Sequence, residues 1–353
     1  MTGMNRRRFL GSAAAATAAA VTVAPELFAA GQRKPAPLKP RRLAPGDTVG
    51  LVAPANATFQ AVDLQIATES LQALGFKVLV GGHLRDRHGY LAGQDKDRAA
   101  DINGFFADAA VRAVLPIRGG WGSSRVLPYL DFDAIRRNPK VVLGYSDISA
   151  LLLAIHAKTG LVTFHGPNGM GRWDAFSVDY FKRVLMQGES ILFENPRQLS
   201  EQNVLTQTEN RTMTISGGKA RGRLLGGNLT VLTTIVGSPY LPSWDGAIFF
   251  CEDVNEDYYR IDRMLTQLKL AGILSRLAGF VFGTCSECGP GDDAFGALTL
   301  EEIFADHIKP LGIPAWSGAM IGHGMPQWTL AQGIEVEADA DAGTLRMLEP
   351  GVT

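Results

Sequence analysis

Short apolar runs alternate with helical patterns along the first half of the chain. Apolar runs of strand length lie at 48–53, 77–80, 111–117 and 141–143. Segments with helical spacing of apolar residues separate or follow them, at 64–74, 96–107 and 148–158. Continuous apolar runs are typical of parallel strands that are buried on both faces. The alternation therefore predicts a parallel sheet with helices on both faces, an α/β domain whose functional groups lie at the carboxyl ends of its strands.

A polar, turn-rich stretch at 195–211 interrupts this pattern and indicates a connection between domains. Beyond it, the alternation of strands and helices resumes at 247–251, 258–270, 278–282 and a closing hairpin near 334–347. A length of 353 residues also favours two domains, because single hydrophobic cores rarely grow beyond about 250–300 residues. We expect an N-terminal domain at 45–194 and a second α/β domain at 212–353.

The start of the chain resembles an export signal. Arginines at 6–8 precede Phe9-Leu10 and an alanine-rich apolar stretch, and small residues follow at Ala29-Ala30. A basic start, a short apolar segment and a small-residue end are typical of a signal peptide. Adjacent arginines followed by Phe-Leu are typical of the twin-arginine route, which exports folded proteins. An ordinary secretory signal, or an anchor that is not cleaved, stays an alternative because Phe28 stands where a small residue is preferred.

We therefore predict a protein that is periplasmic or otherwise exported, with its signal at 1–30 and no stable membrane span after processing. The next residues, 31–44, contain three prolines and five basic residues but little apolar material. This composition is typical of an extended linker.

Charge and cysteine content argue against several classes of function. The net charge is −1, and removal of residues 1–30, which carry a net +2, leaves −3. The chain therefore lacks the basic surface that a nucleic-acid partner requires. Cys285 and Cys288 form a Cys-x-x-Cys pair, which can close a disulfide in an oxidising compartment. The sequence context of a thioredoxin motif and the further ligands of a zinc site are absent, so that redox catalysis, a metal and a cofactor are not expected.

One serine lies where a buried strand leads into a helix. In Gly-Tyr-Ser-Asp at 144–147, Ser146 follows the apolar run 141–143 and precedes the helical segment 148–158. A serine on such a turn projects its hydroxyl away from the sheet, and the next backbone N–H points into the same space, as at a nucleophile elbow. Ile148 replaces the last glycine of the elbow motif, and a serine that caps the helix is the alternative.

A glycine-rich turn follows another buried strand. Arg-Gly-Gly-Trp-Gly at 118–122 comes directly after the run 111–117. Adjacent glycines let a backbone N–H approach a ligand closely, as an oxyanion hole requires. A phosphate-binding loop is disfavoured because its Gly-Lys-Ser/Thr ending is missing, and a plain tight turn is the alternative.

A serine nucleophile needs a base, and the base needs an orienting acid. Of the six histidines, His323 lies between two glycines in a loop, where its ring is free to be placed for catalysis. His165, which follows a strand, is the rival on spacing. Glu252 and Asp253 lie at the carboxyl end of a fully apolar strand, where one of them can hold an imidazole through Nδ1–H. Two solvated acids that cap the next helix are the alternative.

Together these segments resemble the LD-carboxypeptidase family of serine peptidases, which includes muramoyltetrapeptide carboxypeptidases and microcin-immunity peptidases. The resemblance covers about residues 44–348 and rests on the order and spacing of short motifs. The motifs are Pro-Gly-Asp at 45–47, Arg-Gly-Gly-Trp-Gly at 118–122, Leu-Pro at 127–128, Gly-Tyr-Ser-Asp at 144–147, Gly-Pro at 166–167, Gly-Gly-Asn-Leu at 226–229, Glu-Asp at 252–253, Tyr-Arg-Ile at 259–261 and Gly-His-Gly at 322–324.

The resemblance implies a flavodoxin-like N-terminal domain that carries the nucleophile Ser146. It implies a second α/β domain that carries the acid Glu252 and the base His323, with the active site at the domain interface. The family's oxyanion hole uses backbone amides, which map onto Gly120 and Asp147. One departure follows His323, where the family usually has an asparagine and then Leu-Pro-Leu-Gly. Here residues 326–333 read Pro-Gln-Trp-Thr-Leu-Ala-Gln-Gly, which leaves the three catalytic positions intact but puts the pocket shape, and hence the substrate, in question.

The family hydrolyses, through an acyl-enzyme, the amide between an L-configured centre and a terminal D-residue, typically the D-alanine of a murein tetrapeptide. The resemblance thus implies a muropeptide substrate. Arg118, unless it is a solvated or paired charge, can meet the terminal carboxylate, and Trp121 is a second candidate contact. A microcin-type peptidase that acts on a modified peptide or acyl-amide, and a non-catalytic periplasmic binding protein, are the alternatives. A homodimer is compatible with each of these interpretations.

Overall fold

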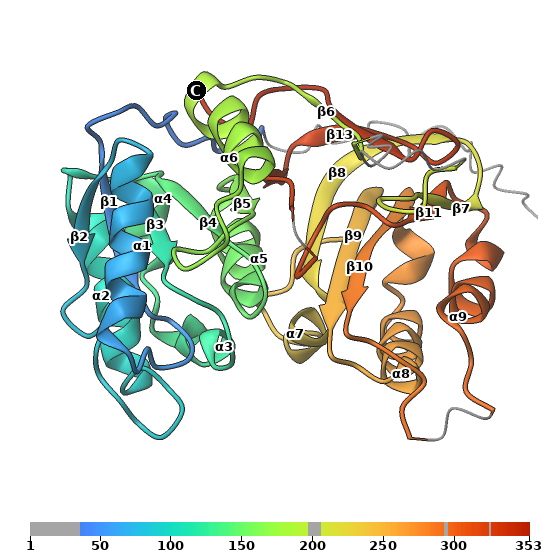
Figure 1. The fold of residues 1–353 in the computed structure, drawn as a ribbon, viewed down its shortest axis with the longest axis horizontal. Coiled ribbons are helices and arrows are strands. Elements are labelled where there is room, and N and C mark those ends of the chain that lie inside the picture. Colours follow the sequence, from blue (N-terminus) through green and yellow to red (C-terminus); the bar gives the residue numbers. More distant parts are fainter. Residues whose placement is uncertain (1–35, 197–205, 293–295, 325) are drawn as a thin grey trace, which may run out of the picture. The chain divides into compact units, whose positions relative to one another are not determined.

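Two β-sheets organise the chain, and the first follows the alternation predicted from the sequence (Figure 1). The structure is a computed structural model that describes residues 36–196, 206–292, 296–324 and 326–353. The predicted signal at 1–30 lies outside the described residues. No helix in the described part of the chain has the length and apolar character needed to cross a membrane.

The regular elements alternate through most of these residues. The strands are β1 Thr48–Val52, β2 Lys77–Val80, β3 Val111–Pro116, β4 Val141–Gly144, β5 Thr163–His165, β6 Leu192–Phe193, β7 Met213–Ser216, β8 Lys219–Asn228, β9 Ala247–Val254, β10 Gly279–Ser286, β11 Ala315–Ser317, β12 Leu330–Gln332, β13 Glu335–Asp339 and β14 Thr344–Met347. The α-helices are α1 Ala61–Ala73, α2 Asp95–Ala107, α3 Ser123–Val126, α4 Phe132–Arg137, α5 Ile148–Thr159, α6 Ala175–Phe181, α7 Leu229–Thr234, α8 Tyr258–Leu270 and α9 Leu300–His307. Short turns of other helix types lie at Leu127–Tyr129, Lys182–Gln187, Leu274–Arg276 and Lys309–Leu311.

The first sheet has the order β12-β5-β4-β3-β1-β2. Strands β1 to β5 are parallel, and their order 2-1-3-4-5 is that of a flavodoxin-like fold. The apolar runs of β1, β3, β4 and β5 are buried because helices cover the sheet, as continuous runs predict, whereas the edge strand β2 is largely exposed. The loops after β1, β3 and β4 leave the same edge of the sheet, which brings the glycine turn at 118–122 and the turn at Ser146 together.

The second sheet has the order β6-β14-β13-β8-β9-β10-β11-β7. Its centre, β8 to β11, is parallel, and the predicted hairpin of β13 and β14 is confirmed as an antiparallel pair beside β8. Strand β9 is buried from Ala247 to Asp253, so that Glu252 and Asp253 end a strand with no solvent on either side. This strand brings both acids to the carboxyl edge of the second sheet.

Two short strands cross the predicted domain boundaries. β6, from the segment 45–194, pairs with β14 in the second sheet, and β12, from the segment 212–353, pairs with β5 in the first. Each adds a partner to an edge strand whose backbone groups would otherwise stay unpaired. Residues Pro37–Thr353 accordingly form one compact unit.

The predicted linker at 31–44 is wrong for its described part. Leu38 bridges Leu161, the N–H of Leu43 donates to the carbonyl of Leu185, and the side chain of Leu43 is buried. Backbone hydrogen bonds connect this stretch to three other segments, although its composition suits a linker. Burial of its few apolar side chains offsets the entropy cost of ordering it.

Helix α5 lies between the two sheets (Figure 1). It contacts β4 and β5 on one side, and β8 and α7 on the other. Nearly all of its side chains are buried, as expected for a helix that is apolar all round. Gly160, with φ of 73°, ends it in the left-handed conformation that favours glycine. The residue that leads into α5 is Ser146, so that the predicted nucleophile lies where the two sheets meet.

Candidate active site

The turn before α5 holds Ser146 in a strained backbone conformation. Its φ is +65°, a region that residues other than glycine rarely occupy. Asp147, not Ser146, is the N-cap residue of α5, and the Ser146 hydroxyl is instead hydrogen-bonded to His323 Nε2 at 3.0 Å. The interpretation of Ser146 as a plain helix cap is therefore wrong. Strain of this kind is concentrated at functional sites.

Three side chains from distant segments form one hydrogen-bonded chain. His323 Nδ1 lies 2.7 Å from Glu252 Oε2, while its Nε2 faces Ser146 Oγ. Glu252 is fully buried at the end of β9, and His323 is partly buried. Gly322, with φ of 99°, lies against Glu252, where any side chain would overlap the carboxylate. The structure therefore brings together the three predicted residues in the order nucleophile, base and acid.

The surroundings of His323 favour its protonated form. Burial lowers the pKa of His323, but the hydrogen bond and charge of Glu252, with smaller effects of Asp253 and Glu287, outweigh it and hold the pKa above its ordinary value. An imidazole with these neighbours can accept the proton of Ser146 and stay stabilised as imidazolium.

Asp253, the other half of the acidic pair, has a different role. Burial, together with the charge of Glu252, raises the pKa of Asp253 to about 6. Its carboxylate accepts hydrogen bonds from Asn228 Nδ2 at 3.0 Å and from the N–H of Thr230 at 2.9 Å. Both acids of the pair are buried, so that the interpretation as two solvated helix-capping acids is wrong.

His165, the rival base, is a buried histidine. Its ring lies 5.2 Å from that of Phe250 and 6.3 Å from that of Tyr145, measured between centroids. Neither ring nitrogen has a hydrogen-bond partner among the described residues. Burial lowers the pKa of His165 to about 4, although the charge of Glu252 opposes the shift. A neutral, fully buried ring without a bond to Ser146 is not placed as its base.

The glycine turn lies against the nucleophile. A Cβ added at Gly119 would lie 3.0 Å from Ser146 Cβ and 3.3 Å from the backbone nitrogen of Asp147. Gly120 has φ of 114° and packs on the side chain of Asn56. The amides of Gly120 and Asp147 make no hydrogen bond in the described part of the chain beyond any within regular elements. Of the predicted oxyanion residues, Asp147 directly follows Ser146 and Gly120 lines the same cavity, while the glycine whose added Cβ would meet Ser146 is Gly119.

Residues that the sequence analysis missed hold this turn in place. Asn56 Oδ1 accepts from the N–H of Trp121 at 2.9 Å, and the buried Arg98 donates to the carbonyls of Gly122, at 3.0 Å, and Pro54. Arg98 gives a recognisable signal, because it is a charge on the apolar face of the helix predicted at 96–107. No local signal marks Asn56.

Two further contacts join the serine turn to its surroundings. Asp147 Oδ2 accepts from the N–H of Ser123 at 2.7 Å. This bond connects the serine turn to the start of α3, which directly follows the glycine turn in the sequence. Asn168 Oδ1 accepts from the N–H of Tyr145 at 3.2 Å. The residues directly before and after Ser146 are therefore both held by hydrogen bonds to other segments, which fixes the position of Ser146.

Gly119→Ala is expected to reduce kcat by about 100-fold, because the added methyl group would displace the Ser146 side chain. Gly119 does not have a positive φ, so that the backbone accepts alanine and the free energy of unfolding should change by less than about 1 kcal/mol. Steady-state kinetics and chemical denaturation measure both effects. Gly104→Ala, in open space on α2, is the matched control and should keep full kcat. Equal kcat in the two variants would contradict the placement of the turn.

A cavity of about 350 Å³ opens onto the hydroxyl of Ser146. Its lining residues come from the glycine turn, the serine turn, the loop after β5 and the base: Ile117, Arg118, Gly119, Gly120, Tyr145, Ser146, Asn168, Met170, Gly171 and His323. Arg118 belongs to this lining, and no ion pair or hydrogen bond of its side chain is found among the described residues. Trp121 is 41% exposed and does not line the cavity. The structure thus places Arg118, but not Trp121, beside the nucleophile.

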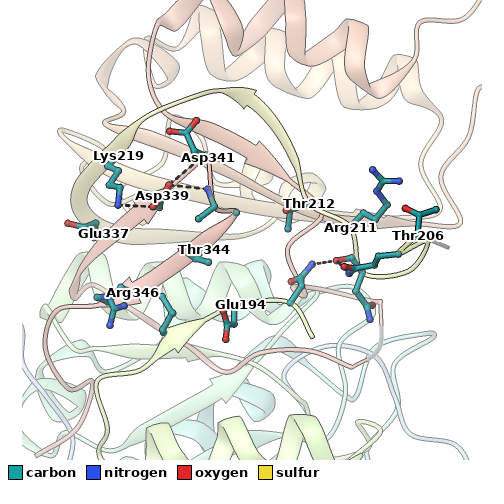
Figure 2. A pocket seen from close by; sticks show the side chains of 16 residues that line it. Glu194, Thr206, Arg211, Thr212, Lys219, Glu337, Asp339, Asp341, Thr344 and Arg346 are labelled. Carbon is teal, nitrogen blue, oxygen red and sulfur yellow. Dashed lines mark hydrogen bonds and ion pairs between the residues drawn. The ribbon is translucent and has the colours of Figure 1, made fainter. Parts of the chain in front are cut away.

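A larger hollow of about 560 Å³ lies elsewhere, along β13 and β14 (Figure 2). Its walls are charged, but Lys219 pairs with Asp339 at 2.8 Å, and Asp341 accepts from the N–H of Gly218. Its described lining includes neither a histidine nor a cysteine. The smaller cavity is therefore the candidate active site, because it contains the predicted nucleophile and the predicted base.

One cluster in the described part of the chain combines possible metal ligands. His83, Asp86 and Asp97 place ligand atoms within 4.8 Å of one another. His83 Nδ1 is hydrogen-bonded to Asp86 at 2.7 Å, and both side chains are well exposed to solvent. An exposed cluster with this internal hydrogen bond needs no ion. The absence of a metal, a cofactor and a nucleic-acid partner, like the homodimer, stays a prediction.

Family models and known relatives match most of the chain. The model of the LD-carboxypeptidase N-terminal domain matches residues 49–166, and that of the C-terminal domain matches 221–338. A probable murein peptide carboxypeptidase of Bacillus subtilis is 39% identical over 320 residues, 89% of this chain and 95% of the relative. The murein tetrapeptide carboxypeptidase of Pseudomonas aeruginosa is 32% identical, over 78% of this chain and 88% of the relative. The microcin C7 self-immunity protein MccF of Escherichia coli is 30% identical, over 89% and 96%.

Solved structures share the fold. MccF in complex with glutamyl sulfamoyl guanosine superposes with a TM-score of 0.80 at 29% identity, over 90% of this chain and all of that chain. Muramoyltetrapeptide carboxypeptidase from Oxalobacter formigenes gives 0.71 at 28% identity, over 85% and 97%. The fold and the matches define a peptidase of the two-domain α/β class. The chain belongs to the LD-carboxypeptidase family, which confirms the family and the fold class predicted from the motifs and supports carboxypeptidase activity.

Proposed function

We propose that this protein is a serine carboxypeptidase that releases the terminal D-alanine of murein tetrapeptides by hydrolysis of an L,D-amide bond. The observation that carries the proposal is the hydrogen-bonded chain of Ser146, His323 and Glu252 at a cavity. A nucleophile, a base and a buried orienting acid in this order are the groups that acyl transfer requires.

The proposed reaction has two stages. Ser146 Oγ attacks the carbonyl carbon while His323 Nε2 takes its proton, and the buried Glu252 stabilises the imidazolium. The N–H groups of Gly120 and Asp147 hold the oxyanion, at about 3–4 kcal/mol of transition-state stabilisation for each donor in comparable sites. His323 then gives its proton to the departing amine. In the second stage water attacks the acyl-enzyme with His323 again as base, which restores Ser146.

The size and charge of the cavity suit a small, negatively charged end of a substrate. Its volume suits a terminal residue, and Arg118 is a cation in its lining. A guanidinium without an internal partner can form charge-assisted hydrogen bonds with a terminal carboxylate. Relatives named murein peptide carboxypeptidases agree with this substrate class. A microcin-type substrate, a modified peptide or acyl-amide, is the second candidate because MccF is similar over almost the whole chain.

We also propose that the protein works outside the cytoplasm after export by the twin-arginine route. The basic and alanine-rich start of the sequence supports this location. The disulfide between Cys285 and Cys288 supports it as well, because disulfides persist in oxidising compartments.

A direct comparison of substrates tests the proposed specificity. The protein is incubated with a disaccharide tetrapeptide that ends in D-alanine, with the same peptide ending in L-alanine, and with an aminoacyl sulfamoyl nucleoside. We expect kcat/KM to be at least about 100-fold higher for the D-alanine peptide, since the L-configured end misplaces the carboxylate at Arg118. Faster turnover of the nucleoside would instead assign the microcin-type function.

A further inference from the structure

A disulfide joins Cys285 and Cys288 at the carboxyl end of β10. Both cysteines are partly exposed, whereas the third cysteine, Cys251, is free and fully buried. The mechanism above uses none of the three. A bridge of this spacing closes a loop of four residues, 285–288, which lies between the segments that carry the acid and the base.

The disulfide loop is bonded to the acid-bearing segment on one side. Cys285 is paired in register with Asp253 of β9, the residue after Glu252. The N–H of Asn255 donates to the carbonyl of Ser286 at 2.8 Å. The residue after the bridge, Gly289, accepts from the N–H of Tyr258 at 2.8 Å. The loop therefore fixes the chain that leaves the catalytic acid.

The residue before the bridge is bonded to the base-bearing segment. Thr284 Oγ1 accepts from the N–H of Gly324, directly after His323, at 3.3 Å. The N–H of Thr284 donates to the carbonyl of Ile321, two residues before His323, at 3.3 Å. One threonine thus holds the His323 loop on both sides of the imidazole, and the next residue is the first cysteine of the bridge.

We infer that the Cys285–Cys288 disulfide is a positioning element for the base, which makes the activity of this site sensitive to reduction. The inference rests on the proposed function of Ser146 and His323. The bridge restricts the conformations of residues 285–288 and so keeps Thr284 in place under the His323 loop. Reduction by a dithiol breaks the S–S bond and forms two thiols, while the dithiol gives up two electrons and two protons and closes to its own disulfide. The partial exposure of both cysteines leaves the bridge within reach of a small reductant.

The test compares the oxidised protein, the dithiothreitol-reduced protein and the variant Cys285→Ser/Cys288→Ser. Thiol titration under native conditions should find no reactive thiol before reduction and two after it, since Cys251 is buried. We expect reduction to slow the labelling of Ser146 by a fluorophosphonate and to lower kcat about tenfold, with KM within twofold. Reoxidation should restore both rates, and the double variant should be slow and insensitive to dithiothreitol.

Thr284→Val separates positioning from a general effect on the fold. This variant lacks the hydroxyl that accepts from Gly324, so that reduction should lower its kcat by less than about twofold further. A tenfold loss on reduction in both backgrounds would show that the bridge does not act through Thr284 and would overturn the inference.

Hydrogen exchange gives a readout that does not depend on activity. The amides of 321–324 should exchange faster after reduction, while those of β9 keep their protection. Unchanged exchange there overturns the inference, whatever the enzyme does. If Ser146 fails to react with the phosphonate in the oxidised protein as well, the proposed function is wrong, and the exchange data still decide whether the bridge orders the His323 loop.

Discussion

Ser146→Ala is expected to lower kcat for D-alanine release by about 10⁴-fold or more, with KM nearly unchanged. The substitution removes the attacking oxygen, and only the oxyanion donors and substrate binding are left to accelerate attack by water. Steady-state kinetics measure the loss, and a fluorophosphonate should label the parent protein but not the variant. A variant that keeps a tenth of the parent kcat would exclude Ser146 as the nucleophile.

The backbone of Ser146 offers a matched control for this result. At φ of +65° both serine and alanine are strained, whereas glycine is not. Ser146→Gly should therefore be as inactive as Ser146→Ala but more stable by about 1 kcal/mol in the free energy of unfolding. The two variants separate loss of the nucleophile from damage to the fold, since Ser146→Gly would be equally inactive although it is the more stable protein.

Glu252→Gln is expected to lower kcat by about 10³- to 10⁴-fold, because the amide can no longer stabilise the imidazolium of His323 or fix its tautomer. The fully buried carboxylate accepts from His323 Nδ1 at 2.7 Å in the parent protein. Glutamine keeps the size of the side chain, so that the protein should still fold. Steady-state kinetics on the variant, with Glu301→Gln at an exposed position of α9 as the matched control, measure the effect.

The pH dependence of kcat/KM tests whether Glu252 raises the pKa of His323. In the parent protein burial lowers the pKa of His323, but the bond and charge of Glu252 outweigh it, so that the pKa is raised. The base works in its neutral form, and kcat/KM should therefore rise with pH through this raised pKa. Without the negative charge the imidazolium is less stable, and the acid limb of the residual activity should move to lower pH. A shift to higher pH would contradict the pairing of His323 with Glu252.

The elements that local patterns determine could be predicted from the sequence. The apolar runs at 48–53 and 111–117 became β1 and β3, and the helix expected at 258–270 is α8 with the same bounds. The short strands β6 and β12 were not predicted, because two or three residues give no periodic signal and their partners lie far away in the chain. Their pairing is a tertiary property of the sheet edges.

The candidate site could be predicted only in part, because some of its residues have a local sequence signal and others are recognised only by distant contacts. His323, between two glycines, and Glu252, at the end of an apolar strand, gave local signals, and the motif order joined them to Ser146. The local sequence could not distinguish a nucleophile from a helix cap at Ser146, because the difference is a backbone angle. Asn56 was missed because the N–H that it binds, that of Trp121, lies 65 residues away.

The most direct test of Ser146 as the nucleophile measures free D-alanine released from a disaccharide tetrapeptide by the parent protein and by Ser146→Ala under the same conditions. We expect stoichiometric release of D-alanine by the parent protein and none above background by the variant, with both proteins folded by circular dichroism. Equal release by the two proteins would contradict the assignment of Ser146 as the nucleophile, and no release by either would contradict the proposed substrate.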